Sequence, residues 1–147
     1  MTPAEKAHEL MELAIALIQV MATEIELLKT REFKELAATQ AQKFALSDVY
    51  HGHMTDIAAN PDIFDGIDPK IRTELKRLAT QLDATARENA NRVRAALELN
   101  TKLVERIALA AQQNATTAAG YTNTGARSTA SMGRAYGQVP VSLNQQL

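Results

Sequence analysis

The chain turns at ten residues, Asn60-Pro61-Asp62-Ile63-Phe64-Asp65-Gly66-Ile67-Asp68-Pro69. Pro61 disfavours helical backbone at the preceding Asn60 because its ring crowds that residue. Gly66 tolerates backbone angles that other residues avoid. Asp68 and Pro69 then suit the cap and the first position of a new helix. The sequence therefore predicts a turn over residues 59–68 between two long helices.

The residues before this turn predict one helix over about 3–58. Thr2 and Glu5 form a Ser/Thr-x-x-Glu capping box, and Pro3 suits the first helical position. Neither Pro nor Gly follows until Gly52, and Ala, Leu, Glu, Lys and Gln dominate the segment. His51-Gly52-His53 is expected to loosen the last turns, which leaves the continuity of the helix at that point open. A helix this long is unstable in water by propensity alone, so it must pack against a partner.

The residues after the turn predict a second helix over about 69–119, with Gly120 as its C-terminal cap. Its apolar residues recur in steps of three and four and form one narrow seam, as in a coiled coil. Asn89 and Asn100 fall on or beside this seam. We interpret them as polar positions that set the register; a buried functional amide is the alternative.

The two predicted helices are nearly equal in length, so the expected fold is all-α: a long, antiparallel, coiled-coil-like two-helix hairpin spanning residues 1–119. This register is expected to place Met21 near Ile107 and Leu109, Leu28 near Lys102 and Leu103, and Phe44 near Ala86. Ile63, Phe64 and Ile67 are expected to fold back and close the open end of the hairpin.

Composition argues against several classes of protein. Lys and Arg number 16 against 17 Asp and Glu, so no net charge draws the chain to nucleic acid or to an anionic membrane. The chain has no Cys, which excludes disulfides and Cys-ligated zinc. The N-terminus lacks the basic region and cleavage site of a signal peptide, and Leu13–Ala22 is too short to span a bilayer. We expect a cytoplasmic protein without direct membrane insertion.

Residues 120–147 differ from the helices in composition. This segment contains four Gly and one Pro, and its only charged side chains are Arg127 and Arg134. It cannot bury enough apolar area to offset its ordering entropy, so a flexible tail is predicted. Tyr121 and Tyr136 could anchor it to a partner, since Tyr supplies a large contact area at low entropic cost.

The first predicted helix carries an apolar arc about 240° wide, whereas one partner helix covers about 100°. A two-helix hairpin cannot cover this arc. One interpretation is self-association into a four-helix bundle, or burial under a folded-back segment. The other is a groove for the amphipathic helix of a client protein. The residues predicted to bind the client are Met11, Ile15, Leu17, Ile18, Met21 and Ile25.

Catalytic and metal-binding patterns are not apparent in the sequence. His51 and His53 are two residues apart, which does not place them on one face of a helix, and no carboxylate pattern accompanies them. A glycine-rich phosphate loop and a nucleophile elbow are also missing. We therefore expect a protein that is not an enzyme and needs no cofactor or metal.

The second helix and the segment after it resemble the FlgN-like flagellar export chaperones, especially the short, divergent ones of alphaproteobacterial type. The resemblance lies in the hairpin and in residues 108–125, ALAAQQNATTAAGYTNTG, where Gly125 follows Tyr121 by four residues. The end of the chain, Pro140-Val-Ser-Leu-Asn144, is similar to such tails. Thr122-Asn123-Thr124 departs from the acidic or Gly-rich turn expected there.

The resemblance implies a cytoplasmic chaperone of type III protein export in bacterial flagellum biogenesis. Such a protein binds the amphipathic C-terminal helices of hook–filament junction proteins and delivers them to the export gate. By position, Tyr121 with Gly125 would dock on the export-gate protein, and Tyr136 is a rival.

Two other functions fit the same pattern. The first is a structural or adaptor coiled coil that forms a homodimer through the wide apolar arc and has no export role. The second is a phasin-like protein that lays the arc on lipid or polymer granules.

Deletion of Gly120–Leu147 is expected to leave the helical content and the melting temperature nearly unchanged, because the segment lacks the apolar residues of a core. Circular dichroism of the full and truncated chains measures both quantities. A large loss of helix would show that the tail is structural.

Overall fold

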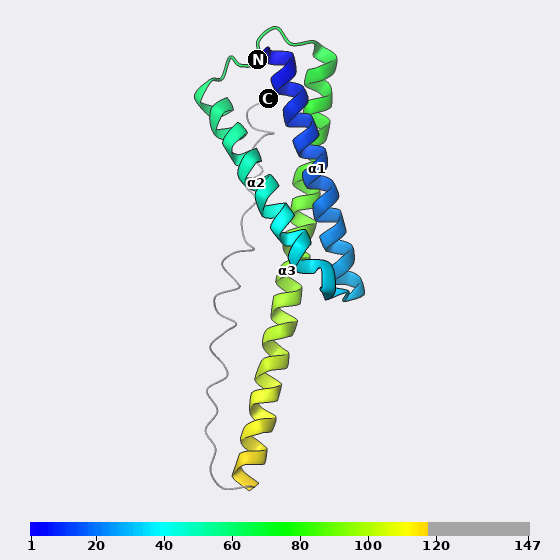
Figure 1. The fold of residues 1–147 in the computed structure, drawn as a ribbon, viewed down its shortest axis with the longest axis vertical. Coiled ribbons are helices and arrows are strands. Elements are labelled where there is room, and N and C mark those ends of the chain that lie inside the picture. The colour runs from blue at the N-terminus through cyan, green and yellow to red at the C-terminus, as the bar shows by residue number, and fades with distance from the viewer. Residues whose placement is uncertain (118–147) are drawn as a thin grey trace. The chain divides into compact units, whose positions relative to one another are not determined.

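The computed structural model of the chain describes residues 1–117, with side chains to residue 115. These residues form α1 (Pro3–Thr30), the short 3-10 helix η1 (Phe33–Glu35), α2 (Leu36–Ala59) and α3 (Pro69–Thr117) (Figure 1). The all-α prediction is confirmed. The prediction of a two-helix hairpin is wrong, because the chain forms three packed helices and the predicted first helix is divided into α1 and α2. The predicted tail over residues 120–147 lies outside the described residues.

The predicted first helix breaks at Arg31. Arg31 adopts the left-handed conformation, with φ 58° and ψ 31°. The backbone N–H groups of Arg31 and Glu32 both donate to the carbonyl of Leu27, which satisfies a group that the helix end would otherwise expose. No Gly or Pro marks this break, so the sequence pattern did not reveal it. The helix continues without interruption through His51-Gly52-His53, where a weakness had been expected.

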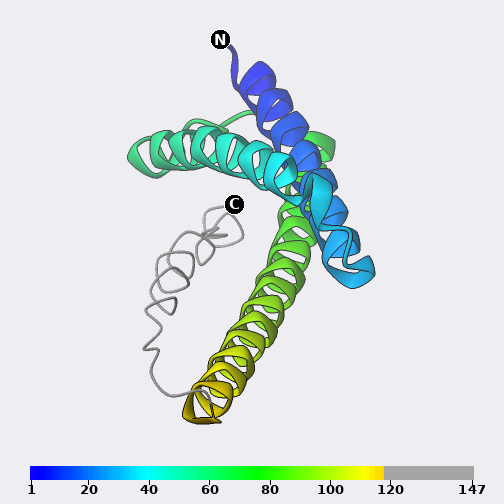
Figure 2. The same ribbon diagram turned by 60° about the horizontal axis from the view of Figure 1, so that its bottom comes forward.

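The break turns the chain, so that α2 packs against α1. The ion pair between Lys6 and Asp56 joins the start of α1 to the end of α2. Figure 2 shows that α2 crosses α1 obliquely instead of extending it. The turn after α2 closes the core as predicted, because Phe64 and Ile67 are buried and Ile63 packs partly buried beside them.

The two predicted helix starts are confirmed in detail. The Thr2 hydroxyl accepts from the Glu5 N–H, and the Glu5 carboxylate accepts from the Thr2 N–H at 2.7 Å. This exchange lowers the pKa of Glu5 below its ordinary value, through hydrogen bonds to the Thr2 backbone and side chain. Asp68 caps α3 by accepting from the Lys70 N–H at 2.8 Å. Both capping motifs were therefore readable from the sequence.

The described chain divides into two compact units. The first is Met1–Asn89, which contains α1, α2 and the first part of α3. Its core is apolar and centres on these buried residues: Leu10, Ala14, Leu17, Met21, Tyr50, Met54, Leu75, Leu78 and Leu82. The second unit begins at Ala90 and contains the rest of α3. Among residues 1–117, none of the helices combines the length and the hydrophobicity that a membrane span requires.

The predicted hairpin register is wrong for the first helix. Met21 was expected beside Ile107 and Leu109, but it is fully buried in the core of the first unit. Glu24, one turn further along α1, hydrogen-bonds to Asn89 instead. Ile107 and Leu109 are exposed. The expectation for α2 was closer, because Lys43 hydrogen-bonds to Asn89, although Phe44 itself is exposed.

Replacing Arg31 with Gly is expected to stabilise the first unit by roughly 0.5–1 kcal/mol, because Gly adopts the left-handed conformation without steric cost. The substitution Arg31→Ala removes the same side chain and keeps the strain, so it serves as the matched control. Thermal or urea unfolding of the three chains measures the difference. Equal stability of the Gly and Ala variants would contradict a left-handed Arg31.

Candidate functional site

The residues predicted to bind a client do not form an open groove. Leu17, Met21 and Ile25 are buried, and Met11 and Ile18 are partly buried against the core. Only the sixth predicted residue, Ile15, is substantially exposed, at 42%. The apolar arc of the first helix is wider than one helix can cover. In the structure α2 folds back over this arc, as the alternative of burial under a folded-back segment predicted. In this conformation, most of the predicted client site is core.

A buried polar cluster joins all three helices. It contains Glu24 of α1, Gln40 and Lys43 of α2, and Asn89 of α3. Glu24 is fully buried, and the Lys43 ammonium lies 2.6 Å from its carboxylate. Asn89 donates to Glu24 at 2.8 Å and accepts from Lys43 at 3.2 Å. Gln40 donates to the second carboxylate oxygen at 3.0 Å.

This cluster satisfies a charge that the core could not otherwise hold. An isolated buried carboxylate is strongly disfavoured, and a paired one is tolerated only when hydrogen bonds satisfy its remaining lone pairs. Here the ammonium, the Asn89 amide and the Gln40 amide supply those bonds. Asn89 is buried between Glu24 and Lys43, and its register-setting role stays a prediction. Asn100, the second predicted register position, is exposed.

The sequence interpretation missed Glu24 and Lys43. Both had been counted among the Glu and Lys residues that favour the predicted first helix. A signal existed, because Glu24 lies between Met21, Ile25 and Leu28 in the middle of the apolar arc. A carboxylate at such a position needs a partner in the core.

The α2 face that packs on α1 also carries polar atoms without partners. Within the described part of the chain, the Ser47 hydroxyl, the Tyr50 hydroxyl and Nδ1 of His53 are buried and form no hydrogen bond. Burial raises the pKa of Tyr50 to about 12. The fold therefore favours the neutral form of the Tyr50 phenol. The contribution of this group to the free energy of unfolding is fully present below pH 10 and is lost as the pH rises toward 12.

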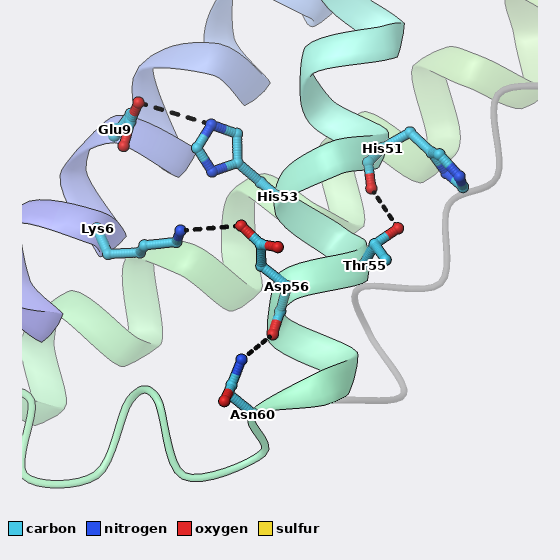
Figure 3. Close-up of polar contacts among 7 residues, drawn as sticks. All are labelled: Lys6, Glu9, His51, His53, Thr55, Asp56 and Asn60. Carbon is cyan, nitrogen blue, oxygen red and sulfur yellow. Dashed lines mark hydrogen bonds and ion pairs between the residues drawn. The ribbon is translucent and has the colours of Figure 1, made fainter.

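Two polar contacts near the end of α2 join it to α1, and the one made by His53 is an ion pair only when His53 is protonated (Figure 3). Lys6 Nζ lies 3.4 Å from the Asp56 carboxylate, and Nε2 of His53 lies 3.6 Å from that of Glu9. His51 points away from His53, so the two rings do not converge. No group of three metal-ligating residues occurs among residues 1–117.

An exposed apolar face lies on the second unit, on the part of α3 beyond Ala90. Leu103 is 51% exposed and Ile107 is 64% exposed, although both were predicted to pack against the first helix. Residues three, four and seven positions apart lie on the same face of a helix. The apolar residues of α3 beyond Ala90 have this spacing, which is a heptad pattern. We call this face the distal seam. It consists of Ala96, Leu97, Asn100, Leu103, Val104, Ile107, Ala110 and Ala111.

The distal seam is the best-defined candidate for binding a partner. It offers a stripe of aliphatic side chains of the width that one helix covers. The predicted docking residues Tyr121, Gly125 and Tyr136 lie outside the described residues. Comparisons with protein-family models, curated proteins and solved structures gave no match to this chain.

Replacing Lys43 with Met is expected to cost about 3–5 kcal/mol of folding free energy, because it leaves the Glu24 carboxylate buried without its cation. The matched control is Lys6→Met, which removes a surface pair and is expected to cost less than about 1 kcal/mol. Urea unfolding followed by circular dichroism gives both values.

The double variant Glu24→Leu/Lys43→Met tests the same pair from the other side. The double variant is expected to lose less folding free energy than Glu24→Leu and Lys43→Met lose in sum, because neither charge is left in the core without its partner. Additive costs would show that the two side chains do not interact.

Proposed function

We propose that this protein is a helix-binding chaperone of flagellar type III export, and that the distal seam of α3 holds the client helix. The observation that supports the proposal is the exposure of Leu103 and Ile107 on a regular, heptad-spaced face. Aliphatic residues with this spacing pair with the apolar side of another helix.

The seam suits a client that is harmful when unpaired. An amphipathic terminal helix exposes apolar area that aggregates, and coiled-coil pairing covers this area without a pocket or a cofactor. The pairing also releases the client without a chemical step. A non-catalytic, cytoplasmic carrier of such helices is therefore the function that this surface supports best.

The export role is supported by the sequence around the seam. Residues 108–125, which carry the resemblance to FlgN-like chaperones, begin within the seam and continue beyond Thr117. The proposed clients are therefore the hook–filament junction proteins, held through their C-terminal helices. Tyr121 with Gly125, or Tyr136, would dock on the export gate.

A structural or adaptor coiled coil is the second candidate, because the same exposed face could join two copies of the chain. Tight self-association that no client disrupts would support that role.

The substitution Ile107→Asp is expected to remove client binding while the chain remains helical, because it places a carboxylate at the centre of the seam. Leu109→Asp is the matched control. Leu109 is 56% exposed, but it lies about 200° around the helix from Ile107. Affinity purification of tagged chains from the source cells, with identification of the bound proteins, measures the effect.

Recovery of junction subunits with the unaltered chain and with Leu109→Asp, but not with Ile107→Asp, would support the proposal. Recovery of only the chain itself would favour the adaptor. Equal recovery of junction subunits with both variants would move the client site away from the distal seam.

A further inference from the structure

The charges beside the distal seam are unevenly placed. At 100° per residue, Arg92 and Arg106 lie on one edge of the seam, about 60° and 100° from Ile107. Glu98 and Glu105 lie on the opposite side of the helix, roughly 160–180° from Ile107. Lys102 and Arg94 are also further from the seam than the two arginines. The charged side chains nearest the partner are thus both cations.

These two arginines are available to a partner. In the part of the chain that the structure describes, neither Arg92 nor Arg106 forms an ion pair or a side-chain hydrogen bond, and both are exposed. They are 14 residues apart, which is two heptads and about 21 Å along the helix. A partner helix that follows the seam would pass both of them.

A second copy of the chain does not complement this edge. In an antiparallel pair the arginine edges of the two helices face each other, which places like charges together. In a parallel pair, the positions opposite Arg92 and Arg106 are Leu97 and Ala111, which carry no charge. Self-association therefore leaves the arginines repelled or unpaired.

The rest of the chain beyond α3 does not complement the edge either. Residues 120–147 contain no Asp or Glu, and their only charged side chains are Arg127 and Arg134. Folding this segment onto the seam would add cations beside cations.

We propose that the distal seam binds a foreign amphipathic helix with acidic residues along one edge of its apolar face, spaced by one or two heptads. The acidic edge faces Arg92 and Arg106, and a polar residue of the partner faces Asn100, which a purely apolar partner would leave unsatisfied. This inference rests on the proposed helix-binding function of α3, and it is independent of the export role. Charge at the edge selects the partner and its direction, while Leu103 and Ile107 supply most of the buried apolar area.

Two fluorescently labelled synthetic helices test the proposal. Both contain about 28 residues, or four heptads, with the same Leu/Ile seam and one Asn in a central core position. They differ only at the flanking positions, which are Glu in one peptide and Lys in the other. Fluorescence anisotropy with the full chain measures each affinity. The Glu peptide is expected to bind about tenfold more tightly, and high salt is expected to shrink this ratio.

Two double variants separate the edge from the overall charge. In Arg92→Glu/Arg106→Glu the preference is expected to reverse toward the Lys peptide. The matched control is Arg94→Glu/Lys102→Glu, which changes the net charge by the same amount at positions further from the seam, and it is expected to keep the preference for Glu. Ile107→Asp is expected to weaken both peptides.

The proposal would be overturned by equal binding of the two peptides, by the same response from both double variants, or by no binding of either peptide. Sedimentation of the chain as a dimer that Ile107→Asp dissociates would also overturn the proposal, because a second copy of the chain would then occupy the distal seam. If the chain prefers the Glu peptide but no junction subunit is recovered with it from cells, the proposal of an acidic helix partner stands and the proposed export role is wrong. The two proposals therefore fail separately.

Discussion

The packing of the three helices depends on the ion pair between Glu24 and Lys43, which lies in the core with Asn89 and Gln40 around it. Aliphatic side chains tolerate small sliding movements, because one Leu packs much like another. A buried charge does not, since any shift that separates it from its partner exposes the full cost of desolvation. The cluster thus fixes which residues of α1, α2 and α3 lie together, and the apolar core fills in around that alignment.

The left-handed Arg31 makes this arrangement possible. It ends α1 after 28 residues and lets α2 return across the apolar arc. Strain at a non-Gly residue in this conformation costs of the order of 1–2 kcal/mol. Burying several aliphatic side chains of α1 is worth considerably more, at about 1.5–3 kcal/mol each. The burial of the apolar arc of α1 therefore outweighs the backbone strain at Arg31, and a straight helix would leave that arc exposed to water.

Once α2 covers the arc of α1, most of the residues predicted to bind a client lie in the core. A regular apolar surface is exposed on α3 beyond Ala90, where Leu103 is 51% and Ile107 is 64% exposed. A helix with this pattern is typical of half of a coiled coil. The arginines on one edge of this face are not complemented by a second copy of the chain, and the partner proposed for it is acidic for that reason.

The sequence alone determined the helical class, the capping box at Thr2, the cap at Asp68, the turn over residues 59–68 and the position of Asn89 on the seam, because each depends on neighbours in the chain or on simple periodicity. It also determined that the arc of helix one was too wide for one partner. Only the tertiary structure decided what covered it. The break at Arg31 has no local marker, since the left-handed residue is stabilised by the packing of α2 that it permits. The partner of Glu24 and the exposure of Ile107 followed from that break, and periodicity within one helix carries no information about which other helix faces it.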